Sequence, residues 1–246
     1  MDHTSDSSYK VYLFIIFAML FWSMSYIWST IVFRYYSPVA TIFLRLLISS
    51  LLLFLFLKLS GKLERIKKKD YKLFFLSAFF NPFLYFIGEN YGLKNSSASI
   101  AAVIISTIPL FTPMAAWFAI REKLHWLNIL GIMVSFTGII IMLVNKDMSI
   151  NIAPVGIIFL LLAVASAVTY SIFLKKLTEK YSPINIIAYQ NLIGLTYFLP
   201  FFILFDLHEV LSVSLNAELL FSLLMLALFA SSLAFIFYAY IINNMN

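Results

Sequence analysis

Cysteine is absent from these 246 residues, and charged residues make up only 11% of them. Without cysteine there can be no disulfide framework, thiol nucleophile or thiolate zinc site. The low charge excludes an ordinary soluble domain, in which about 25% of residues are charged. No glycine-rich phosphate loop is present, so ATP coupling within the chain is not expected. His3, His125 and His208 fall in separate predicted loops, so neither a metal site nor another cofactor is expected.

Apolar residues are abundant instead: 63% of the chain is hydrophobic, and the mean hydropathy is +0.97. A helix needs about 20 apolar residues to cross the hydrocarbon core of a membrane. Eight stretches meet this need, with short connections between them. They are Val11–Phe33, Pro38–Leu59, Leu73–Leu93, Ala98–Ile120, Trp126–Val144, Val155–Leu174, Ile184–Phe205 and Leu219–Ile242. The predicted fold class is therefore all-α, a polytopic transmembrane helix bundle of about eight spans.

Basic residues are distributed unevenly between the two sets of connections. With the N-terminus in the cytoplasm, 13 of the 17 Lys and Arg residues lie in inner segments and three in outer segments, while Arg45 lies within a span. This bias follows the positive-inside rule. We predict a multi-pass protein of the bacterial inner (plasma) membrane with a cytoplasmic N-terminus. The same distribution explains the net charge of +6 without nucleic acid. The basic run Lys67–Lys69 is interpreted as topology control, with anionic lipid or a partner as the alternative.

A short pattern recurs at an offset of 145 residues. Tyr36-Ser37-Pro38 opens the second span and Tyr181-Ser182-Pro183 opens the seventh. Seven residues after each proline lies a polar residue inside the membrane, Arg45 in the first copy and Gln190 in the second. The offset predicts a repeat of five helices, and an odd number of helices makes the second copy enter the membrane upside down. Inverted repeats of this kind are typical of secondary transporters.

The chain resembles the drug/metabolite transporter superfamily, specifically the EamA-type transporters. The resemblance is carried by Phe21-Trp22-Ser23, by Arg45, and above all by Ser97–Leu124, which has Pro109 in mid-helix and ends near Glu122. It implies ten helices in two five-helix repeats, so residues 1–150 are predicted to form the first repeat and residues 151–246 a partial second repeat of three helices. The resemblance also implies that the last two helices are missing.

Polar residues within the spans are the candidates for substrate contact. Ionisable groups are expensive in lipid and usually face a cavity or a partner, and Arg45 and Glu89 are the two inside the predicted spans. Both fall in the outer half of the membrane, where they could meet. One interpretation is a polar site that binds a zwitterion or couples to protons; the other is a structural Arg45–Glu89 pair or a Glu89 side chain that snorkels to the interface. Prolines free backbone carbonyls that can line a pathway or merely kink a helix. The predicted substrate-binding residues are Trp22, Arg45, Asn81, Tyr85, Glu89, Pro109, Tyr170 and Gln190, with Tyr189 and Asn191 as further candidates.

Three functions are compatible with these features. The first is a secondary transporter or exporter that moves a small metabolite, such as an amino acid or a drug-like compound, by alternating access. The second is a truncated, non-transporting membrane protein or an assembly partner. The third is an integral-membrane enzyme, which would need clustered His, Asp or Glu at one interface; the sequence shows no such cluster, so no catalytic residues are predicted.

Overall fold

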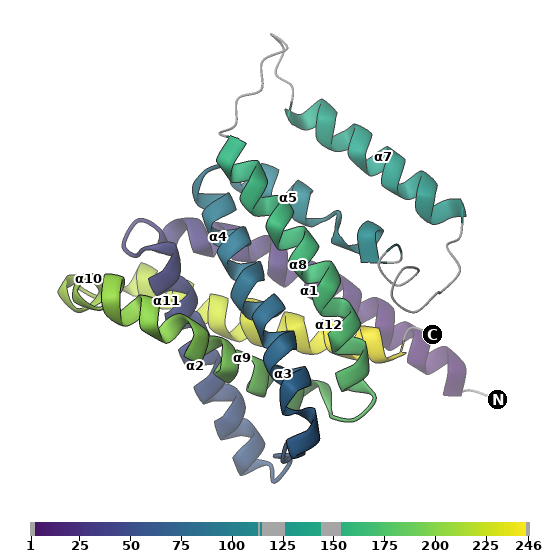
Figure 1. The fold of residues 1–246 in the computed structure, drawn as a ribbon, viewed down its shortest axis with the longest axis horizontal. Coiled ribbons are helices and arrows are strands. Elements are labelled where there is room, and N and C mark those ends of the chain that lie inside the picture. The colour runs from purple at the N-terminus through teal and green to yellow at the C-terminus, as the bar shows by residue number, and fades with distance from the viewer. Residues whose placement is uncertain (1–2, 113, 115–125, 144–153, 245–246) are drawn as a thin grey trace. The chain divides into compact units, whose positions relative to one another are not determined.

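The computed structural model describes residues 3–112, 114, 126–143 and 154–244, which are helical apart from short connections (Figure 1). Among them, six helical segments are long and apolar enough to cross a membrane. They are Tyr9–Val32, Pro38–Leu59, Lys68–Lys94, Pro154–Thr178, Pro183–Ser212 and Ala217–Asn244. Each contains most or all of one predicted span. The chain is an all-α, multi-pass membrane protein.

The other two predicted spans are described in part. The fourth begins as α5 (Ala98–Ile105), passes through a turn at residues 106–107 and continues as helix to Thr112. The rest of this span, residue 114 apart, lies outside the described residues. The fifth predicted span is α7 (Trp126–Leu143).

The chain divides into two compact units, residues 1–83 with 173–246 and residues 84–172. The first unit contains α1 (His3–Val32), α2 (Pro38–Leu59), η1 (Lys68–Asp70), α3 (Tyr71–Ala78), most of the π-helical segment η2 (Phe79–Leu84), α9 (Pro183–Phe201), η3 (Phe202–Asp206), α10 (Leu207–Ser212), α11 (Ala217–Met225), the π-helical segment η4 (Leu226–Leu233) and α12 (Ala234–Asn244). The second contains α4 (Tyr85–Lys94), α5, α7 and most of α8 (Pro154–Thr178).

Helices α2 and α9 pack against each other in opposite directions. Phe43, near the start of α2, stacks on Phe202, just beyond the end of α9, with ring centroids 4.0 Å apart. Phe54, toward the end of α2, meets Tyr189 near the start of α9 at 5.2 Å. Each helix opens with a serine N-cap and a proline in its first turn, where the fixed φ of proline suits the helix and its missing N–H is not needed.

Helix α1 runs antiparallel to the chain of α11, η4 and α12. Phe14 stacks on Phe237 at 4.4 Å, and further along α1 Phe21 meets Phe229 at 4.8 Å. Ile16, which lies between them in sequence, is 65% exposed. Large apolar side chains exposed in this way on a spanning helix face lipid, which matches the composition of the sequence.

In the second unit, α4 packs tightly on α8 through two glycines four residues apart. A Cβ on Gly88 would lie 2.6 Å from the carbonyl oxygen of Phe159 and 2.7 Å from the backbone nitrogen of Ala163. A Cβ on Gly92 would lie 2.6 Å from Cγ of Leu160. Small residues at this spacing let two membrane helices approach closely.

The connections of the first unit meet in two groups. Arg34 lies 3.6 Å from Glu218, both predicted to be outer, whereas Lys180 lies 2.8 Å from Asp70, both predicted to be inner. The grouping agrees with the charge distribution, although which group is cytoplasmic stays a prediction. Asp206 was expected in the loop after the seventh span; instead it is buried at the end of η3, because the helix continues through α10 to Ser212.

Candidate functional site

Arg45 is the largest fully buried side chain of the described residues, at 1% exposure. It lies on α2, and its Nε donates a hydrogen bond of 2.7 Å to Oγ of Ser231 on η4. A charge at the centre of a spanning helix costs about 2.5–3.5 kcal/mol on insertion scales, so it is retained only where partners compensate. The serine lies on a π-helical segment, a wider turn that is frequent at functional sites.

The polar contacts extend from Arg45 across three elements. Ser49, one turn further along α2, lies 2.7 Å from Ser232 of η4, oxygen to oxygen. Asn191 of α9 donates through Nδ2 to Oγ of Ser49 at 2.7 Å and to the carbonyl oxygen of Ser231 at 3.0 Å. We call these five residues the Arg45 cluster. All five are buried, so the cluster is a polar centre inside an apolar bundle.

Gln190 points to a different neighbour. It is 2% exposed and donates through Nε2 to Oγ of Ser77 on α3 at 2.6 Å. Consecutive helical residues diverge by about 100°, which is why Asn191 joins the Arg45 cluster while Gln190 contacts α3. Gln190 is thus buried beside the cluster and bridges α9 to α3.

Asn81 marks the interruption of the third predicted span. Its backbone is extended, with φ −143° and ψ 118°, and it precedes Pro82 within η2. The Asn81 side chain is 5% exposed. The ring of Pro82 lies directly against Gly194 of α9, where no Cβ would fit. The third predicted span is therefore interrupted here, with a buried polar side chain at the interruption.

The second unit holds four of the predicted residues. Tyr85 donates its hydroxyl to Oε1 of Glu89 at 2.8 Å, and Glu89 is 6% exposed. Tyr170 of α8 is 1% exposed, whereas Pro109 is exposed. Because Arg45 belongs to the first unit and Glu89 to the second, the expected Arg45–Glu89 meeting stays a prediction.

Trp22 of α1 is half-buried against α12. Its ring lies edge-on to Phe235 at 5.2 Å and to Tyr238 at 5.6 Å. Its indole nitrogen is buried and has no hydrogen-bond partner among the described residues. The Arg45 cluster contains no side chain of α1, so Trp22 is a separate candidate.

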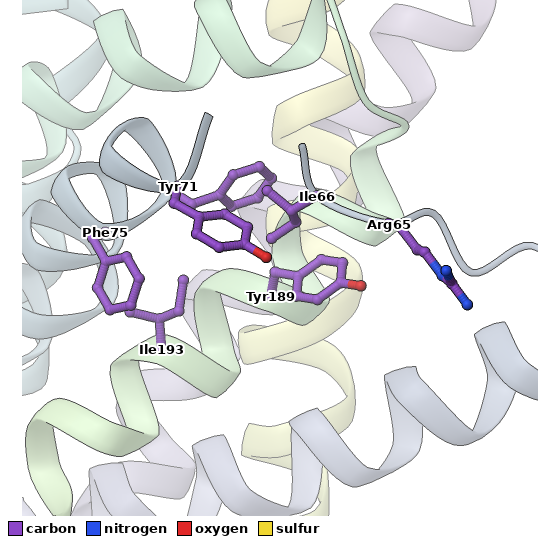
Figure 2. Close-up of a pocket in the computed structure, with 7 residues that line it drawn as sticks. Arg65, Ile66, Tyr71, Phe75, Tyr189 and Ile193 are labelled. Atoms are coloured by element: carbon purple, nitrogen blue, oxygen red, sulfur yellow. The ribbon is translucent and has the colours of Figure 1, made fainter. Parts of the chain in front are cut away.

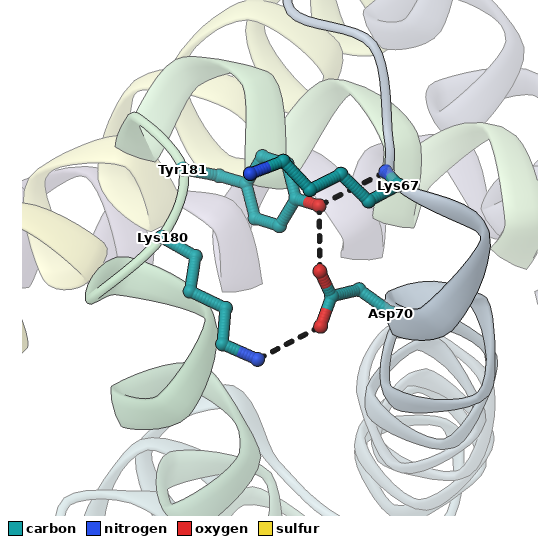
Figure 3. A network of polar contacts seen from close by, with 4 residues as sticks. All are labelled: Lys67, Asp70, Lys180 and Tyr181. Atoms are coloured by element: carbon teal, nitrogen blue, oxygen red, sulfur yellow. Dashed lines mark hydrogen bonds and ion pairs between the residues drawn. The ribbon is translucent and has the colours of Figure 1, made fainter.

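A second polar network joins the connection after α2 to the start of α9 (Figure 3). Asp70 accepts from Nζ of Lys180 at 2.8 Å and from the hydroxyl of Tyr181 at 2.9 Å, and Tyr181 accepts from the backbone N–H of Lys67 at 3.0 Å. The hydrogen bond to Asp70 raises the pKa of Lys180, and burial raises the pKa of Tyr181. We call this network the Asp70 clamp.

The clamp continues through Asn185, in the first turn of α9. Its Nδ2 donates to the carbonyl oxygen of Lys62 at 2.9 Å, and its Oδ1 accepts from the backbone N–H of Glu64 at 2.9 Å. Tyr189 donates to the carbonyl oxygen of Glu64 at 2.8 Å. The connection between α2 and α3 is therefore held onto α9 at several points.

Four serines of these networks were not among the predicted residues: Ser49, Ser77, Ser231 and Ser232. Two features of the sequence could have pointed to these serines. Ser49 follows Arg45 by one helical turn, and both Ser49-Ser50 and Ser231-Ser232 are serine pairs within apolar runs. Single serines in a spanning helix are common, so these signals are weak alone. No group of three or more His, Asp or Glu residues in the described ranges is arranged to hold a metal ion.

Comparison with known proteins finds a family match over most of the chain and several similar transporters. The model of the EamA-like transporter family matches residues 9–144 and 154–246. An uncharacterized transporter of Archaeoglobus fulgidus is 28% identical over 192 residues, which is 78% of this chain and 67% of that protein. The uncharacterized transporter YdfC of Bacillus subtilis is 30% identical over 169 residues, or 67% of this chain and 54% of YdfC. The matched region thus spans between half and two thirds of these two relatives.

The chain is also similar to a transporter with a named substrate and to a protein of known structure. An S-adenosylmethionine uptake transporter of Rickettsia prowazekii is 26% identical over 167 residues, covering 58% of this chain and 56% of that protein. A solved crystal structure superposes with a TM-score of 0.69 at 18% identity, covering 95% of this chain and 78% of the other. The second similarity concerns the fold alone.

Proposed function

Because this chain belongs to the EamA-like transporter family, we propose that it moves a small metabolite across the inner membrane by alternating access, with the Arg45 cluster as part of the substrate path. Membership of the family makes it a transporter-type membrane protein, and we propose no catalytic role for it. The substrate, the coupling and the orientation with a cytoplasmic N-terminus belong to the proposal.

The single observation that carries the site is the burial of Arg45. A guanidinium at 1% exposure inside a spanning bundle is expensive, and ionisable groups within spans usually face a cavity or a partner. Guanidinium groups bind carboxylates through parallel charge-assisted hydrogen bonds. We therefore assign a metabolite with a carboxylate as the substrate class. S-Adenosylmethionine, named for the relative from R. prowazekii, carries such a group and is one probe.

The antiparallel packing of α2 and α9 supports an inverted repeat of residues 1–150 and 151–246. Repeats related by an axis in the membrane plane place equivalent helices in opposite directions. Both helices begin with a serine N-cap and a proline, and their equivalent residues Arg45 and Gln190 are both buried. In this arrangement the substrate path lies near the contact of the two repeats, with Glu89 as a candidate for proton coupling.

The test is uptake of pooled amino acids and S-adenosylmethionine into proteoliposomes with an imposed pH gradient. Replacing Arg45 by Gln keeps a hydrogen-bond donor near Ser231 but removes the charge. A lost charge-assisted contact is worth about 1.5–3 kcal/mol, so we expect a loss of flux of about tenfold to a hundredfold. Arg45→Lys should recover part of it.

The matched control is Lys176→Gln, which removes an exposed positive charge outside the Arg45 cluster. It should leave flux unchanged, and the elution profile of each variant shows whether it is folded. A folded Arg45→Gln protein with wild-type flux would exclude Arg45 from the path. Absence of flux above empty liposomes for every probe would count against the transporter proposal for this chain.

A further inference from the structure

A pocket of about 360 Å³ lies in the first unit, and none of its lining residues belongs to the Arg45 cluster (Figure 2). Tyr71, Phe74 and Phe75 of α3 form one wall. Tyr189 and Ile193 of α9 form another, and Arg65 of the connection before α3 lies at its edge. The pocket is therefore built at the end of two spanning helices, beside the Asp70 clamp.

The lining of this pocket changes from polar to apolar along the helix axes. Both α3 and α9 start at this end of the unit, so Phe75 and Ile193 lie one turn, about 6 Å, deeper than Tyr71 and Tyr189. Figure 2 shows the hydroxyl groups of both tyrosines pointing toward the side where Arg65 lies. A ligand that fits this gradient has a polar head and an apolar tail.

The segment that carries Arg65 and Tyr71 of the pocket is strongly basic. Its basic residues from Arg65 onward are exposed: Arg65, Lys67, Lys68, Lys69 and Lys72. The two acids of the same segment are occupied elsewhere. Asp70 accepts from Lys180 and Tyr181, and the carboxylate of Glu64 accepts from the backbone N–H of Ser182 at 3.3 Å. The five basic residues outnumber these two acids, and Asp70 is itself paired with Lys180, so the segment keeps a net positive charge.

We propose that this pocket binds one anionic phospholipid of the adjacent leaflet. The phosphate lies at Arg65 and the hydroxyl of Tyr71, because the hydroxyl of Tyr189 already donates to the carbonyl oxygen of Glu64. Part of an acyl chain runs past Phe75 and Ile193. Tyr71 and Phe75 are 47% and 48% exposed on a spanning helix, so the pocket opens toward lipid. Basic pockets between membrane helices bind anionic head groups, and each nearby Lys or Arg contributes about 1 kcal/mol.

The experiment counts lipids bound to the purified full chain in detergent by native mass spectrometry. The probes are phosphatidylglycerol and phosphatidylcholine with the same acyl chains, and glycerol phosphate, which has no chain. We expect a single saturable phosphatidylglycerol, at least about fivefold preferred over phosphatidylcholine, and little binding of glycerol phosphate. Arg65→Gln should weaken phosphatidylglycerol binding by about fivefold, the factor that corresponds to one such charge.

Two matched pairs of variants locate the site. Lys176→Gln removes an exposed charge outside the pocket and should leave binding unchanged. Ile193→Trp fills the deep end and should abolish saturable binding, whereas Leu199→Trp, at an exposed position of the same helix, should not. Equal binding of both phospholipids, or equal effects within either pair, would overturn the proposal. Glycerol phosphate binding as tightly as phosphatidylglycerol would instead indicate a free-phosphate site and also overturn it. The measurement needs no transport, so it stands apart from the proposed function.

Discussion

The contact of α4 with α8 permits a prediction that can be worked from the structure. In Gly88→Ala the new methyl carbon would lie 2.6 Å from the carbonyl oxygen of Phe159 and 2.9 Å from Cβ of Ala163. Carbon–oxygen contacts of this kind are normally about 3.3 Å or longer, and carbon–carbon contacts about 3.5 Å or longer. The two helices must therefore separate by about 0.7 Å, because the opposing atoms belong mostly to backbone and cannot rotate away.

Two opposing effects determine how Gly88→Ala changes the free energy of unfolding. Overpacking of a tight contact costs about 1–3 kcal/mol, while alanine favours a helix interior over glycine by up to about 1 kcal/mol. We expect Gly88→Ala to lower the free energy of unfolding by about 1–2 kcal/mol. In Gly92→Ala the nearest atoms are Cγ and Cδ2 of Leu160, a side chain that can change rotamer, so the loss should be smaller.

The matched control is Gly138→Ala on α7, where nothing lies within 4 Å of the added Cβ. Only the helix-propensity term acts there, so stability should rise by about 0.5–1 kcal/mol. The assay is thermal unfolding of the three variants in one detergent, compared with the unchanged chain. A Gly88→Ala protein as stable as Gly138→Ala would refute the close approach of α4 and α8.

Two further predictions concern titratable groups. The Asp70 hydrogen bond raises the pKa of Lys180, so its contribution to stability is complete below the ordinary lysine pKa of about 10.4 and is lost as pH rises through the raised value. In Asp70→Asn this cause of the raised pKa is removed, so thermal stability should be lower at neutral pH and the part of the alkaline loss that comes from this pair should disappear; an unchanged profile would contradict it. If Glu89 couples substrate to protons, Glu89→Gln should make proteoliposome flux independent of the imposed pH gradient, and unchanged pH dependence would exclude that role.

Membrane residence and most helix positions were predictable because they depend on one local property. A run of about 20 apolar residues must span the bilayer, and such runs can be counted along the chain. Arg45 and Glu89 were predictable for the same reason, since an ionisable group inside an apolar run is conspicuous. Their burial agrees with this expectation, while their role in transport stays a prediction.

The partners of these residues were not predictable, because they are distant in sequence. Ser231 is 186 residues from Arg45, and nothing in an apolar run distinguishes a serine that faces an arginine from one that bonds its own backbone. The π-helical geometry of η4 is likewise invisible to periodicity. Lys180 was counted only as a topology signal and Asp70 was not singled out, yet they form an ion pair 110 residues apart in sequence.

The N-cap serines of the two copies of the Tyr-Ser-Pro motif make different hydrogen bonds. In the first copy, the hydroxyl of Ser37 caps the backbone N–H of Ala40 at 3.1 Å. At the 145-residue offset, Asn185 occupies the position of Ala40. The hydroxyl of Ser182 accepts from Asn185 at 2.8 Å and makes no such cap. Asn185 thereby also reaches the connection at Lys62 and Glu64.

This single difference turns a local helix cap into a long-range attachment. The opposite end of the unit has the Arg34–Glu218 pair, whose side chains are 62% and 50% exposed, and exposed ion pairs contribute little, about 0–1 kcal/mol. The Asp70 clamp, by contrast, includes Asp70 at 4% and Asn185 at 1% exposure. Under the proposed inverted repeat, both ends would be equivalent if the copies were identical. Their divergence at one position therefore gives the predicted inner end the firmer attachment.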